Sequence, residues 1–244
     1  MKNSVPQDSG LNGDDANSSS EHAETAGKDS AVHEQVFLKL RDLIISGQLS
    51  PGETLSVRGI AKTFDVSTMP ARDAIRRLAA AGAIEFNDTR RIKVARIDRT
   101  HLEQIRFARL QLEPEISRHA VRRLSKMPKR KKQLLETLDQ YDRLLDQAIN
   151  AGDIDGYARH NSAFHFEIYR AAESTVLMRL VEDLWLQLGP TMRTVLGRLG
   201  TSNLVEDRHK EAMAALRDND EDALAEAIHM DIREGLDSLR ETVV

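Results

Sequence analysis

The chain has 244 residues, of which 40% are apolar and 30% charged, so it is long enough for two domains and can bury a core. It contains no cysteine, which excludes disulfides and thiolate metal sites. No apolar run approaches the ~20 residues of a membrane span, and the first residues lack the apolar segment of a signal peptide. We therefore expect a cytoplasmic protein with no membrane partner.

The formal net charge of −4 is unevenly distributed along the chain. Residues 1–30 hold two Lys or Arg and six Asp or Glu, residues 31–97 hold eleven and seven, and residues 98–244 hold twenty-two and twenty-six. The middle segment is therefore positive between two negative segments. A basic segment within an acidic chain is typical of a module that binds nucleic acid.

Residues 1–30 are rich in Ser, Asn, Asp and Gly and show no apolar periodicity. They cannot bury enough surface to offset the entropy of ordering, so we expect a disordered tail. An amphipathic helix follows, with apolar residues at positions 32, 36, 40, 43 and 44, and it is predicted to end at Ser46-Gly47. Pro51-Gly52 then indicates a turn.

Two short helices joined by a tight turn are predicted within residues 57–78. Apolar residues recur at helical spacing up to position 64, are interrupted at 65–67 and resume at 71. Ser67 suits the N-cap of the second helix. The pattern predicts a helix-turn-helix whose second helix carries Arg72 and can enter the major groove of DNA. An ordinary helical hairpin with a solvated basic face is the alternative that this stretch alone leaves open.

Two short strands are predicted at residues 84–86 and 92–94, where apolar and polar residues alternate. The turn between them carries Arg90 and Arg91. A helix, a helix-turn-helix and a basic hairpin follow one another in a winged helix, so we expect residues 31–97 to form a winged-helix DNA-binding domain. Arg90 and Arg91 would then lie over the phosphate backbone or enter the minor groove.

From residue 98 onward the sequence shows no strand signal. Helices are predicted at 100–124, 128–151, 153–173, 175–199, 203–218 and 220–241, with a kink at Gly189-Pro190. Six or seven helices with short connections form an antiparallel bundle. The predicted fold class is therefore mainly α, with an N-terminal winged helix-turn-helix and a C-terminal all-α antiparallel helical bundle over residues 98–244.

Polar side chains interrupt the apolar faces of four of these helices. Arg109 either forms an internal ion pair with a carboxylate of another helix or faces a cavity that accepts a ligand carboxylate. Asn161 and His165 are four residues apart and point to one place, where single ligands from two further helices can complete a metal shell. Each residue taken alone also fits a satisfied polar group in the core. Together they predict one polar pocket, formed by Arg109, Asn161, His165, His209 and Asp231.

The stretch SGQLSPGETLSVRGIAKTFDVSTMPARDAIRRLAAAGAIE resembles the N-terminal domain of GntR-type bacterial transcription regulators. In that family G-x-L-x-P-G precedes the helix-turn-helix, and V-S-x-x-P-x-R opens the recognition helix. The resemblance implies that Arg58, Ser67, Thr68 and Arg72 contact DNA. Family members often have Arg where this chain has Thr68, and usually have Gly in the wing where it has Arg91.

The stretches IRFARLQLEPEISRHAV, NSAFHFEIYRAAES, DRHKEAMAALRDND and DALAEAIHMDI resemble the helical effector domain, called FCD, of the FadR branch of these regulators. In many of those proteins an acidic residue and three histidines bind a divalent metal beneath a small carboxylate effector. The resemblance implies that Arg109 contacts the effector. His119 is interpreted as a surface or core residue, with a hydrogen bond to a metal ligand as the alternative, because it lies on the apolar stripe of its helix. The resemblance also implies that Zn, Ni or Mn is held by Asn161, His165, His209 and Asp231. Asn161 replaces the usual Asp and Asp231 replaces a usual His, which favours harder ions.

We therefore expect a ligand-responsive transcription regulator, acting as a repressor, that binds a pseudo-palindromic operator in double-stranded DNA as a homodimer. Its effector would be a small organic acid bound beside the metal. One alternative is a DNA-binding protein whose bundle only dimerises and holds neither metal nor effector. The other is a metal-dependent enzyme, since two histidines and a carboxylate can activate water.

Overall fold

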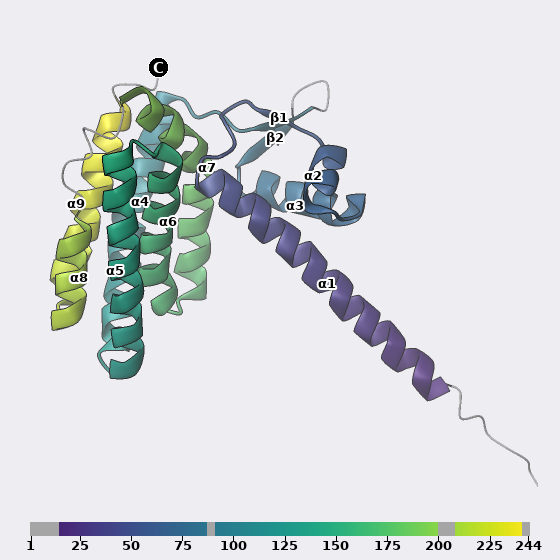
Figure 1. The fold of residues 1–244 in the computed structure, drawn as a ribbon, viewed down its shortest axis with the longest axis horizontal. Coiled ribbons are helices and arrows are strands. Elements are labelled where there is room, and N and C mark those ends of the chain that lie inside the picture. Colours follow the sequence, from purple (N-terminus) through teal and green to yellow (C-terminus); the bar gives the residue numbers. More distant parts are fainter. Residues whose placement is uncertain (1–14, 87–90, 200–207, 241–244) are drawn as a thin grey trace, which may run out of the picture.

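The computed structural model describes residues 15–86, 91–199 and 208–240, and this part of the chain is mostly helical (Figure 1). The N-terminal elements are α1 (Asp15–Ile45), β1 (Thr54–Leu55), α2 (Val57–Phe64), α3 (Thr68–Ala80), β2 (Ile84–Phe86) and β3 (Ile92–Val94). The C-terminal elements are α4 (Arg99–Leu124), α5 (Pro128–Ala151), α6 (Ile154–Ala171), α7 (Thr175–Leu199), α8 (His209–Asp218) and α9 (Glu221–Arg240). A winged helix-turn-helix followed by a helical bundle confirms the predicted fold class.

Helix α1 begins earlier than the sequence predicts. Its first residue is Asp15, so its bounds overlap the segment 1–30 that the sequence predicts to be a disordered tail, and that tail stays a prediction. Residues 1–14 lie outside the described residues. No proline lies between Asp15 and Ile45, and a helix that is already nucleated gains one hydrogen bond for each residue added to its end.

Local interactions explain the boundaries of the helix-turn-helix. The hydroxyl of Ser56 caps α2 by accepting a hydrogen bond from the backbone N–H of Gly59 at 2.9 Å. Helix α2 ends at Asp65, which has a positive φ of 53°, a conformation that Asp adopts more readily than most residues. Ser67 stands at the predicted N-cap of α3 with extended backbone, although its side chain makes no capping hydrogen bond.

The three strands form one antiparallel sheet in the order β1–β3–β2. Strands β2 and β3 occupy the residues at which the alternating pattern placed them, and Phe86 pairs with Ile92. Strand β1 was not predicted, because two residues are too few to show an alternation; it exists through the pairing of Thr54 with Lys93. The wing residues 87–90, and with them Arg90, lie outside the described residues.

Helices α4 to α9 lie side by side and form the bundle (Figure 1). The bounds of α4, α5, α6, α7 and α9 agree with the predicted ones to within two residues. Helix α8 begins at His209 rather than at the predicted residue 203, and residues 200–207 lie outside the described residues. Helix α7 continues through Gly189-Pro190, where a kink was predicted. Among the described helices none is long and apolar enough to cross a membrane.

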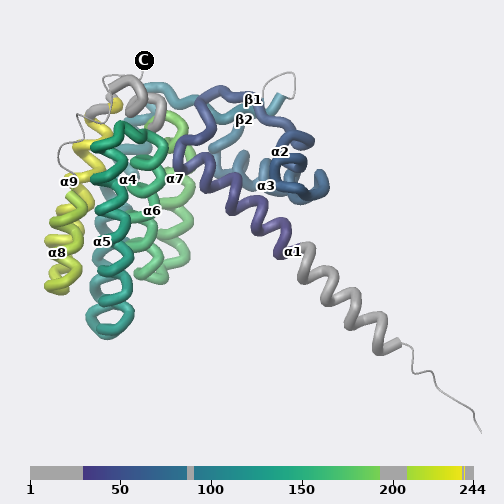
Figure 2. The backbone as a smooth tube through the Cα atoms, viewed as in Figure 1, coloured from purple at the N-terminus to yellow at the C-terminus, as the bar shows by residue number. Residues whose placement is uncertain are grey.

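The C-terminal end of α1 lies against α7 and so connects the DNA-binding part with the bundle (Figure 2). Gly189 of α7 permits this approach, since a methyl group there would come within 2.6 Å of the carbonyl oxygen of Ile45 and closer still to that of Ile44. Arg41 of α1 forms an ion pair with Glu182 of α7. The contact therefore combines a close backbone approach with a charged pair.

A second contact between the two parts is made by Gln187 of α7. Its side-chain amide donates a hydrogen bond to the backbone oxygen of Ala81, just after α3, at 3.0 Å. Its amide oxygen lies 2.8 Å from Nε2 of His101 on α4. Helix α7 thus contacts the end of the helix-turn-helix as well as the end of α1.

Candidate nucleic-acid interface and metal centre

Helix α3 has one buried face and one exposed face. On the exposed face, Thr68, Arg72 and Arg76 are spaced four residues apart and form one stripe along the helix. Guanidinium groups on such a stripe can donate paired hydrogen bonds to guanine edges or bind phosphates. The opposite face packs into the core through Pro70, Ala71, Ala74, Ile75 and Leu78.

The other predicted DNA contacts lie at the starts of the two helices. Arg58 is the second residue of α2 and is exposed, and Ser67 is exposed just before α3 with a hydroxyl that does not cap the helix. Arg77 of α3 instead faces α1. Its guanidinium donates to Glu34 at 2.8 Å and lies 3.5 Å from the ring centroid of Phe37. Arg77 therefore holds α3 against α1, which leaves Arg72 and Arg76 as the cations exposed on this helix.

The wing contributes one described residue of the predicted interface. Arg91 is exposed immediately before β3. Its predicted companion Arg90 lies outside the described residues. An exposed guanidinium at the edge of a short sheet can reach a phosphate backbone, as the winged-helix prediction requires.

Three candidate metal ligands from three helices meet inside the bundle: His165 of α6, His209 of α8 and Asp231 of α9. A ligand atom of each lies within 4.8 Å of the other two. Nε2 of His165 is 3.0 Å from one carboxylate oxygen of Asp231, and Nε2 of His209 is 3.9 Å from the other. Both imidazoles are buried, while the carboxylate is 17% exposed. We call these residues the His/Asp cluster.

Two aromatic residues orient the imidazoles of the His/Asp cluster. The hydroxyl of Tyr169 lies 3.1 Å from Nδ1 of His165, so the other ring nitrogen faces the carboxylate. The ring of His209 stacks on Phe164, with centroids 4.0 Å apart and planes inclined by 24°. A hydrogen-bond partner such as Tyr169 fixes the tautomer and direction of a metal-binding imidazole, whereas stacking on Phe164 fixes only the plane of the His209 ring.

The carboxylate of the cluster is anionic. Burial alone would raise the pKa of Asp231, but the hydrogen bond and charge of His165, together with the charge of His209, lower that pKa well below its ordinary value of 3.8. Asp231 is therefore ionised at neutral pH. An ionised carboxylate beside two imidazoles is a donor set suited to divalent Zn, Ni or Mn.

Arg109 pairs with Glu113, one turn further along α4, rather than with a carboxylate of another helix. Nη2 donates to Oε2 at 3.1 Å, and Nε donates to Oε1. The side chains are 4% and 0% exposed, and the guanidinium lies 4.3 Å from the ring centroid of Trp185. Burial acts to lower the pKa of Arg109, but the charge of Glu113 and its hydrogen bond raise it above the ordinary value. Arg109 is thus a buried, permanently charged group.

Glu113 connects this ion pair to the His/Asp cluster. Its Oε2 accepts hydrogen bonds from the hydroxyl of Tyr169 at 2.6 Å and from the indole N–H of Trp185 at 3.1 Å. Because Tyr169 also reaches His165, one chain of contacts runs from Arg109 to the cluster. Burial, followed by the charge of Glu113, raises the pKa of Tyr169 well above its ordinary value of 10.0. The phenol therefore stays protonated and can donate.

Asn161 is the fourth predicted ligand. It lies on α6 one turn before His165 and is half-buried. The spacing of four residues places both side chains on one side of the helix. Its part in holding a metal stays a prediction.

His119 lies at the surface of the bundle, which agrees with its interpretation as a surface residue and not with the alternative of a support for the His/Asp cluster. Its side chain is 40% exposed, and Nε2 lies 3.2 Å from a carboxylate oxygen of Glu115 on the same helix. The buried stripe of α4 includes Ile116 and Ala120, and His119 stands at the edge of that stripe rather than within it.

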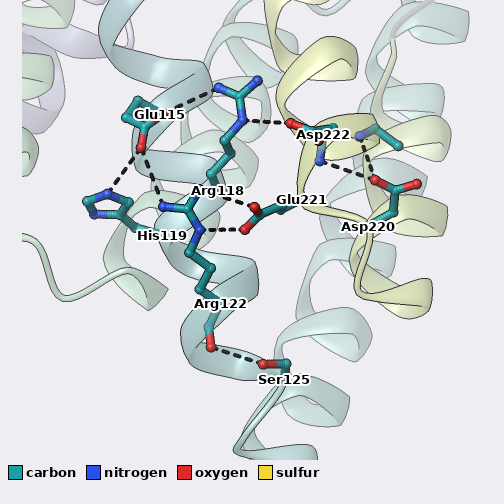
Figure 3. Close-up of polar contacts among 9 residues, drawn as sticks. Glu115, Arg118, His119, Arg122, Ser125, Asp220, Glu221 and Asp222 are labelled. Atoms are coloured by element: carbon teal, nitrogen blue, oxygen red, sulfur yellow. Dashed lines mark hydrogen bonds and ion pairs between the residues drawn. The ribbon is translucent and has the colours of Figure 1, made fainter.

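The surface around His119 carries a network of ion pairs between α4 and the start of α9 (Figure 3). Arg118 pairs with Asp222, and Arg122 pairs with Glu221. Acidic residues in the first turn of α9 also oppose the positive end of its helix dipole. The network fixes α9, which carries Asp231, onto α4.

Sequence reasoning missed three residues of the buried network. Glu113 and Tyr169 had an available signal, since each stands four residues after a candidate residue, Arg109 and His165 respectively. Trp185 had none, because it comes from a separate helix and its approach depends on how α4 and α7 pack. Two exposed residues of α3 were also left out of the predicted DNA contacts, Arg76 and the 64% exposed Met69.

Two family models match the chain. Residues 104–234 match the FCD domain. Residues 32–94 match the bacterial regulatory proteins of the gntR family. The two matches cover the bundle and the winged helix respectively.

Two proteins of Escherichia coli strain K12 are similar over most of the chain. The HTH-type transcriptional regulator McbR is 26% identical over 204 residues, which is 81% of this chain and 90% of McbR. The HTH-type transcriptional repressor RspR is 24% identical over 210 residues, which is 86% of this chain and 90% of RspR. The solved structure of E. coli McbR/YncC has a TM-score of 0.77 at 24% identity, covering 86% of this chain and 97% of that one, so the fold is shared.

Proposed function

Because the chain belongs to the gntR family of bacterial regulatory proteins and carries an FCD domain, we propose that this DNA-binding transcription regulator acts as a repressor controlled by a small organic acid. Its relatives are regulators, so the alternative of a metal-dependent enzyme is set aside. The relative RspR is named a transcriptional repressor, which supports repression rather than activation. The observation that carries the sensor function is the buried chain of contacts between Arg109 and the His/Asp cluster.

We infer that two copies bind one pseudo-palindromic operator, since two recognition helices related by a twofold axis match two half-sites. Arg72 and Thr68 on α3 read base edges, and Arg58 and Ser67 fix the register on the backbone. Arg91 and Arg90 add phosphate contacts from the wing. The exposure of the described members of this set, and the burial of the opposite face of α3, support these roles.

For the metal, the proposed ligands are the His/Asp cluster and Asn161. Bonds of about 2.0–2.2 Å place neighbouring ligand atoms roughly 3.0–3.4 Å apart. The separations of 3.0 and 3.9 Å within the cluster fit such an ion after a small movement of His209. A divalent ion would supply a positive binding point for a carboxylate, and Tyr169 would hold His165 in the required tautomer.

Arg109 is the proposed partner of the effector carboxylate. Glu113 accepts hydrogen bonds from two nitrogens of Arg109. A guanidinium carries five N–H donors, so Arg109 can bind a ligand carboxylate with the donors that Glu113 does not use. An effector that draws Arg109 away from Glu113 would also change the acceptor available to Trp185. The effector thereby acts on α7, which contacts the DNA-binding part.

The competing proposal is a regulator whose bundle only dimerises. It accounts for the Arg109–Glu113 pair as a structural ion pair and for the His/Asp cluster as a satisfied polar core. It predicts that neither a metal nor an organic acid changes stability or DNA affinity. A stability measurement therefore separates the two proposals.

The test is a thermal-shift titration of chelator-treated protein with Zn²⁺, Ni²⁺ and Mn²⁺, followed by small carboxylates, with elemental analysis of the reloaded protein. Binding to the folded state adds about 2.7 kcal/mol at a hundredfold excess over the dissociation constant. We expect a metal-dependent shift in wild type and in His119→Ala, whose imidazole is on the surface, and its loss in His165→Ala. Protein that takes up no metal and shows no shift with any acid would favour the dimerising bundle.

A further inference from the structure

A cavity of about 320 Å³ lies between the end of α1 and the bundle, apart from the His/Asp cluster. Its lining includes Leu43 and Ile45 of α1, Tyr141 of α5 and Phe166 of α6. Its size falls in the range of roughly 300–1,000 Å³ that is usual for small-molecule sites, which often occur where domains meet. The cavity is therefore of a size and in a place suited to a ligand.

The α6 wall of the cavity has a regular pattern. Arg159, Ala163, Phe166 and Arg170 all line the cavity and follow one another at spacings of four, three and four residues. They therefore form a single stripe, apolar in the middle and cationic at both ends. The two arginine Cα atoms are about 16 Å apart along the helix, so long side chains from both ends can reach toward the centre.

The charges around the cavity leave a cation available on this stripe. Arg41 is engaged by two carboxylates, that of Glu182 and that of the neighbouring Asp42. Arg170 pairs with Glu167. Arg159 is exposed, and in the described part of the chain it forms no salt bridge with a carboxylate.

We propose that this cavity is a second ligand site, which binds an organic carboxylate with an apolar body. The carboxylate would pair with Arg159, and the apolar body would lie on Ala163 and Phe166 against the side chains of α1. An inorganic anion would leave the apolar walls unused, and a neutral molecule would leave the guanidinium unpaired. The combination of walls thus selects for both features of the ligand.

A ligand in this cavity would touch both parts of the protein at once. Its carboxylate offers Arg41 an alternative to Glu182, the ion pair that holds α1 against α7. On the other side, Phe166 packs against Trp185, with ring centroids 5.3 Å apart, and Trp185 donates to Glu113. The site therefore borders the interdomain contact as well as the buried network. Its proposed carboxylate partner is Arg159, whereas the cation of the buried network is Arg109.

The test follows 4-fluorobenzoate by ¹⁹F NMR in a titration of full-length, chelator-treated protein. Two control ligands test the ring and the carboxylate separately. 4-Fluorobenzyl alcohol has the ring without the charge, and fluoroacetate has the charge without the ring. Arg159→Ala removes the proposed partner from an exposed position, and Ala163→Phe fills the cavity. Arg143→Ala, which removes an exposed arginine that pairs with Asp139 within α5, is the matched control.

We expect saturable binding of 4-fluorobenzoate to wild type and to Arg143→Ala. 4-Fluorobenzyl alcohol and fluoroacetate should each bind at least tenfold more weakly. Loss of a charge-assisted hydrogen bond should weaken binding to Arg159→Ala by about tenfold or more, and Ala163→Phe should abolish it. No saturable binding to wild type, or equal binding to Arg159→Ala and wild type, would overturn the proposal. Binding that is kept in Arg159→Ala and lost in His165→Ala would place the probe at the His/Asp cluster, which overturns the second site but leaves the proposed function standing.

Discussion

Replacing Glu113 by leucine removes the carboxylate that compensates a fully buried guanidinium. Arg109 is 4% exposed and has no access to bulk water that could take over the role of Glu113. Removing one member of a buried ion pair costs about 3–5 kcal/mol. For a chain of this size each kcal/mol lowers the melting temperature by roughly 2–4 °C. We therefore expect Glu113→Leu to melt roughly 6–20 °C below wild type.

A double variant separates the buried charge from the other bonds of Glu113. In Arg109→Met with Glu113→Leu the charge is gone, and what remains is the indole N–H of Trp185 and the hydroxyl of Tyr169 without their shared acceptor. Each orphaned donor costs about 1–3 kcal/mol in both variants. Only Glu113→Leu alone also keeps an unpaired buried charge, so the double variant should be the more stable of the two. Tyr169 keeps its contact with His165 in both variants.

The assay is urea unfolding followed by helical circular dichroism and by the fluorescence of Trp185, the single tryptophan of the chain. Asp139→Ala serves as the control, because its pair with Arg143 is exposed and should cost no more than about 1 kcal/mol. A loss for Glu113→Leu as small as that of the control would refute the reasoning. So would a double variant that is less stable than the single one.

Three further predictions concern the DNA face, the buried phenol and the interdomain contact. In gel shifts Arg72→Ala should lose about 1–3 kcal/mol of operator affinity, whereas Arg77→Ala should lower the stability of the protein rather than its sequence preference. If Arg72→Ala loses the same affinity for operator and for random DNA, Arg72 contacts a phosphate and not a base. Burial and a neighbouring carboxylate raise the pKa of Tyr169. The stability that the protonated phenol contributes is therefore complete below pH about 10 and is lost as the pH rises further. A titration at 295 nm should show one phenol of raised pKa that is absent from Tyr169→Phe. Gly189→Ala should lower the free energy of unfolding by about 1–3 kcal/mol, because the added methyl group overpacks against α1. In Gly235→Ala the methyl group meets nothing within 4 Å, so that free energy should rise by up to about 1 kcal/mol. An unchanged stability of Gly189→Ala would contradict the close approach of α1 and α7.

The helices and the two wing strands were predictable because their signals are local. The phase of α3 follows from the spacing of its apolar residues, and the end of α3 before Gly82 follows from a glycine that adopts a positive φ of 76°. The convergence of His165 and Asp231 could be proposed from a family resemblance, but their 3.0 Å approach depends on how α6 and α9 pack. The partner of Arg109 was sought on another helix although a carboxylate stands four residues away.

The parts that the sequence did not predict depend on long-range contacts or on chain continuation. Strand β1 exists only through its pairing with β3, which lies about forty residues further along the chain. The start of α1 at Asp15 follows from propagation of a helix and not from any apolar pattern. The role of Arg77 was indistinguishable from that of Arg76 in the sequence, because only the position of α1 decides which arginine meets Glu34 and which meets solvent.

Helix α7 is the element through which the buried network can bias the DNA-binding part. Trp185 donates to Glu113, while Gln187, two residues later, bonds the backbone oxygen of Ala81 at the end of the helix-turn-helix, and Gly189 packs on α1. A ligand shifts a conformational equilibrium only through contacts that differ between two states, so a change at Glu113 must reach Ala81 through such a shared element. Gln187→Ala should therefore weaken the dependence of DNA affinity on the effector while leaving effector binding itself unchanged, as measured by paired gel-shift and calorimetric titrations. An unchanged dependence would mean that the contact between Gly189 and α1 carries the coupling without Gln187.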